Sequence, residues 1–282
     1  MSPNNISMRR RFFISASLSW AGSSALAQPV RFTVTGSLEQ GSLALGSAPP
    51  GSLVALDGRP LRVTADGRFV FGFAPDQTKS SLVTVRYPGG GGDSRSFTPT
   101  ARQYEIERVN GLPQNTVTPP PEVAARIAHE AETIYLARLS DSAGSDFLSG
   151  FDWPAPGIES GVFGSQRIDN GVAMSPHYGV DMAAPIGTPI VAPADGVVSI
   201  SDDYYLDGGF TLIDHGQGVS TSYLHQSQRL VRAGEAVKRG QRIGLIGATG
   251  RATGPHLHWA MNWFEVRLDP SRSTRKPKPE PL

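Results

Sequence analysis

The sequence predicts a mainly β protein, in which a small N-terminal β-sandwich is joined by a linker helix to a second, antiparallel β domain. Glycine and proline are abundant, at 32 and 23 of 282 residues, and they follow no collagen-like repeat. Runs rich in β-branched and aromatic residues alternate with turn signals at intervals of about 8–12 residues, which is typical of all-β domains. Hydrophobic residues make up 39% of the chain, enough to form a packed core.

The first 27 residues have the pattern of a signal peptide. Arg9–Arg11 precede a short apolar run, Phe12–Ala21, and Ala25–Ala27 form a small-x-small cleavage site. The run is shorter than the ~20 residues that a membrane span needs, although an uncleaved anchor is the alternative. We therefore expect cleavage after Ala27 and export to the periplasm, through either the Sec or the twin-arginine pathway.

The charge of the mature chain argues against a nucleic-acid partner. Removal of residues 1–27 takes away three arginines and no acidic residue, which leaves 23 basic and 25 acidic side chains. No later segment is apolar for long enough to cross a membrane, so we expect no transmembrane segment in the mature chain.

Residues 28–103 are predicted to form the β-sandwich. Strand-like runs occupy 31–35, 52–56, 68–71 and 82–87. The dipeptides Asp57-Gly58 and Asp66-Gly67 are signals for tight turns. This region has no histidine and no cluster of chemically active side chains, so we expect it to bind a ligand or a partner protein, to restrain the second domain, or simply to act as a spacer.

Residues 104–149 are predicted to be a linker that contains a helix over 122–139. The helix prediction follows from Val123, Ile127 and Ile134 at helical spacing, and from Pro121 at the first turn. Residues 150–270 return to short strands that are rich in glycine and proline, and they are predicted to form the second β domain. The polar, proline-rich residues 271–282 are expected to be disordered.

The histidines are concentrated in this second β domain. Five of the six lie between His177 and His258, and the chain has no cysteine, which excludes thiolate metal sites and thiol catalysis. His177 and Asp181 are four residues apart in a turn-rich segment. His256 and His258 alternate on a predicted strand, so their side chains point to the same face.

A metal ion would explain this grouping of imidazoles. Nitrogen and carboxylate ligands without sulfur suit a catalytic zinc with three protein ligands, although a solvent-facing histidine pair is the simpler alternative. His215 and His225 lie between the two pairs, and the spacing alone does not say which histidines bind the metal and which move protons.

These motifs resemble those of the lysostaphin-type (LytM) zinc metallopeptidases, metallopeptidase family 23. The resemblance covers about residues 150–270 and includes His177-x-x-x-Asp181, His256-x-His258, and the segments 192–198, 214–218, 223–225 and 250–255. It implies a LytM-type antiparallel β peptidase domain in which His177, Asp181 and His258 bind Zn²⁺. It also implies that His225 and His256 are the catalytic histidines, and that His215 is structural.

The resemblance further implies an endopeptidase that hydrolyses peptide cross-links of bacterial peptidoglycan. The main alternative is a non-enzymatic LytM-type regulator that binds and activates another cell-wall hydrolase, but such regulators typically lack some metal ligands. A biotinyl-like carrier module would explain the strand pattern and none of the histidines. Many family members place a tyrosine near the cleft, which Tyr204 or Tyr205 is expected to supply, and Asn170 is a candidate for approaching the metal in a latent state.

Overall fold

A computed structural model describes residues 31–109, 120–169, 172–173 and 175–278 of the chain. The predicted signal peptide and Asn170 lie outside the described residues. Residues Arg31–Leu282 cluster as one compact unit. In the described residues, no helix has the length and apolar character that a membrane span requires.

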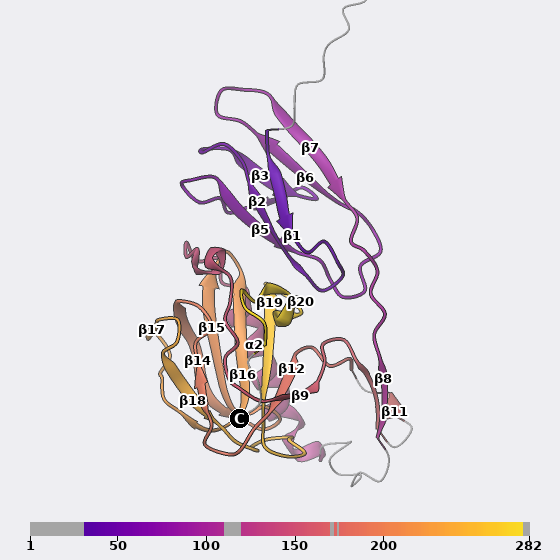
Figure 1. Ribbon diagram of the computed structural model, residues 1–282, viewed down its shortest axis with the longest axis vertical. Helices are drawn as coiled ribbons and strands as arrows, with labels where there is room; N and C mark the ends of the chain where they lie inside the picture. Colours follow the sequence, from indigo (N-terminus) through magenta and orange to yellow (C-terminus); the bar gives the residue numbers. More distant parts are fainter. Residues whose placement is uncertain (1–30, 110–119, 170–171, 174, 279–282) are drawn as a thin grey trace, which may run out of the picture. The chain divides into compact units, whose positions relative to one another are not determined.

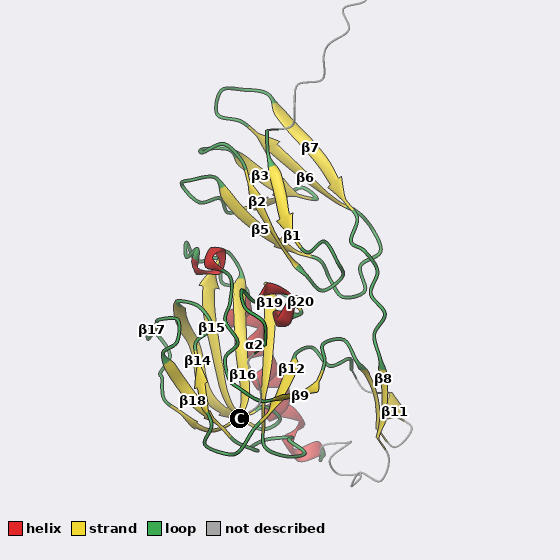
Figure 2. Ribbon diagram, viewed as in Figure 1, coloured by secondary structure: helices red, strands yellow, loops and turns green. Residues whose placement is uncertain are grey.

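The N-terminal region consists of two antiparallel sheets that share one core, as the sequence predicts (Figures 1 and 2). Phe71 of one sheet meets Phe97 of the other at a ring-centroid distance of 6.2 Å. Asp57 and Gly58 both have positive φ and connect two strands directly, which is the two-residue hairpin that their sequence favours. The three-stranded sheet is β1 (Thr33–Gly36), β2 (Leu43–Ser47) and β5 (Arg68–Gly72); the four-stranded sheet is β4 (Arg59–Leu61), β3 (Leu53–Leu56), β6 (Ser81–Arg86) and β7 (Gly92–Phe97).

The C-terminal region is built on one large antiparallel sheet. Its main path has the order β17-β14-β15-β16-β19-β12-β9, while β18 joins β13 to β16 and β20 pairs with β19. The strands are β9 (Ile158–Gly161), β12 (Val180–Ala183), β13 (Pro189–Val191), β14 (Gly196–Tyr204), β15 (Gly208–Gly216), β16 (Val219–Arg229), β17 (Ala236–Val237), β18 (Arg242–Ile246), β19 (His256–Trp263) and β20 (Val266–Leu268). A separate small sheet contains β8 (Ile106–Val109), β10 (Gln166–Asp169) and β11 (Val172–Ala173).

The helix of the predicted linker, α2 (Ala124–Arg138), is part of the large-sheet domain. Its one buried residue, Ile134, packs with Tyr204, Phe210 and Leu212, which project from β14 and β15. The 3-10 turn η1 (Pro121–Val123) precedes it, in agreement with the helix-start signal of Pro121. The helix therefore covers part of a sheet face and does more than connect two domains.

Residues 271–278, the described part of the tail that is predicted to be disordered, form specific contacts with the rest of the chain. The tail begins with a 3-10 turn, η3 (Pro270–Ser273). Another 3-10 turn, η2 (Asp146–Ser149), lies between α2 and β9. Arg275 forms hydrogen bonds through both Nε and Nη2 with the Asp152 carboxylate, at 2.9–3.0 Å. Trp153 donates its indole N–H to the carbonyl of Lys276. Polar composition suggested disorder, but the sequence does not reveal these distant partners.

Candidate metal centre

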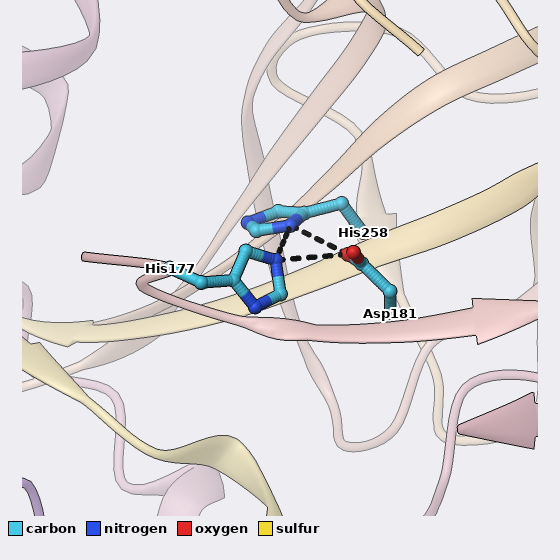
Figure 3. A group of neighbouring side chains, drawn as sticks. All are labelled: His177, Asp181 and His258. Atoms are coloured by element: carbon cyan, nitrogen blue, oxygen red, sulfur yellow. Dashed lines mark hydrogen bonds and ion pairs between the residues drawn. The ribbon is translucent and has the colours of Figure 1, made fainter. Parts of the chain in front are cut away.

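Three side chains that are distant in sequence meet at the junction of β12 and β19. In the antiparallel pairing of these strands, Asp181 lies opposite His258 and Ala183 lies opposite His256. Asp181, His258 and His256 are therefore on one face of the sheet. Figure 3 shows Asp181 and His258 pointing toward His177, which precedes β12.

The potential ligand atoms form a compact triangle. His177 Nε2 lies 3.0 Å from Asp181 Oδ1 and 2.9 Å from His258 Nδ1, and the third edge, from His258 Nδ1 to Asp181 Oδ1, is 2.9 Å. Three atoms at this spacing can all lie within ~2.0–2.2 Å of a single ion, the range of Zn–N and Zn–O bonds. No other set of three or more histidine or acidic side chains in the described residues has this geometry. The residues therefore fit a metal ion with nitrogen and oxygen ligands.

Backbone contacts hold His177 in the form that a metal requires. His177 Nδ1 lies 3.1 Å from the carbonyl oxygen of Val162, which can only accept a hydrogen bond. Nδ1 must therefore carry the proton, and the lone pair of Nε2 faces Asp181 and His258. The backbone N–H of His177 donates to Ser165 and its carbonyl accepts from Gly164, so the 162–165 loop fixes the residue on both sides.

The electrostatics of the site favour an anionic Asp181 and a neutral His258. Burial opposes ionisation of Asp181, but the close contacts of its carboxylate with the rings of His177 and His258 outweigh burial and hold the pKa of Asp181 well below its usual range. Burial lowers the pKa of His258. Neutral imidazole and ionised carboxylate are the protonation states that ligate a metal.

Two glycines leave the space that the ligands occupy. A Cβ atom on Gly161 would lie 2.6 Å from Asp181 Oδ2, and a Cβ atom on Gly179 would lie 2.5 Å from His258 Nε2. Neither glycine stands out in the sequence. What distinguishes them is their position close to the ligand side chains in the folded chain. For Gly161 this position results from the pairing of β9 with β12, where Gly161 lies opposite Asp181.

The remaining two predicted site residues, His225 and His256, also lie here. Their ring centroids are 4.7 Å apart, and His256 Nε2 is 3.8 Å from Asp181 Oδ1. His225 Nδ1 contacts the carbonyl of Thr249, and His256 Nδ1 contacts that of Gly254, each at 2.8 Å. A carbonyl cannot donate, so both Nδ1 atoms carry the proton and both Nε2 atoms are left as proton acceptors.

His225 reaches this position through an unusual backbone conformation. Its φ is +63°, a region that non-glycine residues seldom occupy, at a register shift between β15 and β16. Strict alternation along β16 would place the side chain of His225 on the face opposite to Leu224 and therefore away from His258, which lies opposite Leu224. The register shift instead brings His225 close to His256. Its backbone N–H donates to Asp207 at 2.8 Å, and burial, followed by the nearby His256, lowers the pKa of His225 to about 4.

The model of peptidase family M23 matches residues 175–270, which include all five of these side chains. A solved structure, that of a putative peptidase M23 from Pseudomonas aeruginosa, is 30% identical and has a TM-score of 0.64. That match covers 83% of this chain and 93% of the other. The chain belongs to peptidase family M23.

Curated relatives match this M23 peptidase over about a third of its length. Peptidoglycan DD-endopeptidase ShyA of Vibrio cholerae is 50% identical over 88 residues, which cover 31% of this chain and 20% of ShyA. An uncharacterized metalloprotease of Haemophilus influenzae is 48% identical over 103 residues, 33% of this chain and 21% of the relative. The match thus spans about a fifth of the length of either relative.

His215, Tyr204 and Tyr205 of the M23 peptidase have other partners than the proposed ligands. His215 is fully buried, with Nδ1 against the Asp195 carbonyl and Nε2 against Thr221 Oγ1, as a structural residue would be. Tyr204 stacks on Phe210, and the backbone N–H of Tyr205 donates to Glu130 of α2. Within the described residues, the contacts of both tyrosines thus involve β15 and α2 and not the proposed metal ligands.

A cavity of about 310 Å³ opens beside the ligands. Its lining includes His177, Asp181 and His256, together with Ser160 from β9 and Thr253 from the loop that precedes β19. A peptide that enters this cavity therefore has access to the ligand triangle and to His256.

Proposed function

We propose that this M23 peptidase is an exported zinc metalloendopeptidase that hydrolyses peptide cross-links of bacterial peptidoglycan. The observation that carries the proposal is the complete set of three ligand atoms, 2.9–3.0 Å apart, beside the histidine pair His225 and His256. The names of the relatives support the reaction class, since ShyA is a peptidoglycan DD-endopeptidase.

In this proposal, His177, Asp181 and His258 hold Zn²⁺, which when bound supplies Lewis-acid polarisation of the scissile carbonyl and activation of water. The ionised Asp181 compensates part of the positive charge. The 162–165 loop keeps His177 in its ligating tautomer through the contact with Val162.

His225 and His256 act as the proton-transferring pair. Each has its Nδ1 proton engaged by a backbone carbonyl, so its Nε2 is free to take a proton from the attacking water. The protonated imidazole then donates to the developing oxyanion or to the leaving amine. General acid–base catalysis of this kind contributes about 10²–10⁴-fold to the rate.

The predicted signal peptide over residues 1–27 supports the cellular location of the substrate. Export followed by cleavage after Ala27 would bring the enzyme to the periplasm, where peptidoglycan lies. We also propose that the N-terminal β-sandwich contacts the wall or a regulatory protein partner, because it has none of the histidines of the site.

The decisive experiment is digestion of purified cross-linked sacculi with the zinc-loaded chain 28–282, with mass spectrometry of the released muropeptides. We expect conversion of dimers to monomers, its loss with chelator, and its return with added Zn²⁺. A chain that binds zinc but cleaves nothing would support a regulator that activates another hydrolase. A chain that binds no zinc would overturn the metal assignment.

A further inference from the structure

Two guanidinium groups lie on the catalytic face of the sheet without a carboxylate partner. Arg138, the last residue of α2, donates through Nη2 to Ser222 Oγ at 3.3 Å. Arg267 of β20 places its Cζ 5.6 Å from the ring centroid of Tyr178, the neighbour of His177. Within the described part of the chain, neither guanidinium is in an ion pair, whereas Arg126 at the other end of the same helix is paired with Glu130.

The strand register places both arginines beside the metal centre. Leu224 lies opposite His258, and Ser222, which Arg138 contacts, lies opposite Ala260. Arg267 lies opposite Asn262. His258, Ala260 and Asn262 alternate on one face of β19, so Ser222 and Ala260 are one step of about 7 Å along the strand from the ligand His258.

The part of the sheet face around Arg138 and Arg267 carries an excess of positive charge. Burial, followed by repulsion from Arg267, lowers the pKa of Arg138 to about 9, and burial also lowers the pKa of Arg267. The charge of Asp207 raises the pKa of both arginines, although Asp207 forms no ion pair with either within the described residues. Burial raises the pKa of Asp207 itself. Two partly buried cations beside one carboxylate leave an excess of positive charge, so an anion at this place would be stabilised.

Polar groups without partners surround the same place. Arg138 Nε, Ser220 Oγ and both amide atoms of Asn262 are buried and have no hydrogen-bond partner within the described residues. Ser220 and Asn262 are directly opposite each other on β16 and β19. Buried polar groups are normally satisfied, so a cluster of unsatisfied ones beside two cations indicates a ligand. Both arginines are partly exposed, so a ligand can reach them.

We propose that Arg138 and Arg267 form a subsite for a free carboxylate of the peptide substrate. The inference rests on the proposed function, since it assigns a substrate group to the same site. Planar guanidinium groups match carboxylates with paired N–H donors, and the peptides of peptidoglycan carry free carboxylates. A carboxylate bound here lies about two residues along β19 from His258, and it positions the scissile carbonyl over the ligand triangle.

The test compares two versions of one cross-linked peptide dimer, with free carboxylates or with carboxamides. For the wild-type chain, we expect kcat/KM to be about 10–100-fold higher on the free acid. Arg138→Gln should lower kcat/KM on the free acid by about that factor, mainly because KM rises. It should change kcat/KM on the carboxamide little. Arg138→Lys should recover part of the loss, while Arg126→Gln, the matched control on the same helix, should leave both substrates unchanged.

A second measurement separates failure of the subsite from failure of the proposed function. Isothermal titration of the zinc-loaded chain with an uncross-linked stem peptide, as acid and as amide, requires no hydrolysis. Preference for the acid that Arg138→Gln or Arg267→Gln abolishes supports the subsite, even if the wild type cleaves no dimer. Equal binding of acid and amide, or equal losses on both dimers, would overturn it. Zinc content and circular dichroism verify that each variant is folded. If Arg138→Gln does not fold, Arg267→Gln is used for the same comparison.

Discussion

At the scale of single residues, the five site side chains separate into two groups by their hydrogen bonds. His177, Asp181 and His258 direct an acceptor atom toward a common centre. His225 and His256 each donate the Nδ1 proton to a backbone carbonyl and lie beside this group of three. The first arrangement suits the proposed metal binding, and the second suits the proposed proton transfer.

This separation predicts opposite outcomes for two alanine variants. His258→Ala should lose stoichiometric zinc as well as activity, because it removes one of three ligands. His225→Ala should retain zinc but lose about 10²–10⁴-fold in kcat, the contribution of a proton-transferring group. Metal analysis and muropeptide kinetics check both, with His129→Ala on α2 as a control. Loss of zinc in His225→Ala would show that it acts as a ligand.

His215 predicts a pH dependence of stability. Burial lowers the pKa of His215 to about 4, whereas an unfolded histidine titrates near 6.5. Below pH 6.5 the unfolded chain binds a proton that the folded chain excludes, so the stabilisation is complete above pH 6.5. About 3 kcal/mol is lost as the pH falls toward 4.

Urea unfolding between pH 8 and pH 4 measures this effect. His215→Gln should be less stable than the wild type at pH 8, because it disturbs the contacts with Asp195 and Thr221. Its free energy of unfolding should also fall less steeply between pH 6.5 and pH 4. Parallel curves for the two chains would show that His215 is not the group responsible.

At the scale of structural elements, β9 and the turn before β12 fit closely around the ligands. A methyl group added at Gly161 would meet Asp181, and one added at Gly179 would meet His258. Gly161→Ala and Gly179→Ala should therefore weaken zinc binding by about 10–100-fold, the usual cost of disturbing groups that orient metal ligands. Competition with a chromophoric chelator measures the affinity. Gly89→Ala, where the Cβ atom meets nothing within 4 Å, should leave it unchanged.

Packing of α2 on the sheet predicts a stability effect remote from the metal. Ile134 is 7% exposed against β14 and β15, while its neighbour Tyr135 is 50% exposed. Ile134→Ala should cost about 2–5 kcal/mol in the free energy of unfolding. Tyr135→Ala should cost less than about 0.5 kcal/mol. Equal effects in denaturant titrations would mean that the helix is not held through Ile134.

The sequence predicts elements and candidate ligands better than it predicts long-range contacts. Alternation places His256 and His258 on one face, and the Asp57-Gly58 hairpin follows from its turn chemistry. The position of His225 depends on a register shift and a positive φ that no local pattern reveals. The roles of Gly161 and Arg138 depend likewise on chain segments distant in sequence.

At the scale of the whole molecule, folding assembles the proposed metal centre. His177 and His258 are 81 residues apart, and their ring nitrogens meet only when β12 pairs with β19. An unfolded chain has no such triangle, so zinc should bind the folded state preferentially and shift the unfolding equilibrium by mass action.

Zinc should therefore raise the unfolding temperature of the whole chain. At a free concentration of 100 times its dissociation constant, the added stability is about 2.7 kcal/mol. Calorimetry with buffered zinc and with chelator should show a Tm that rises with the logarithm of free zinc. Asp181→Asn, which removes the anionic ligand while keeping a similar shape, should show a weaker dependence, and His258→Ala should show none. A Tm independent of zinc in the wild-type chain would mean that the triangle of His177, Asp181 and His258 does not bind the ion.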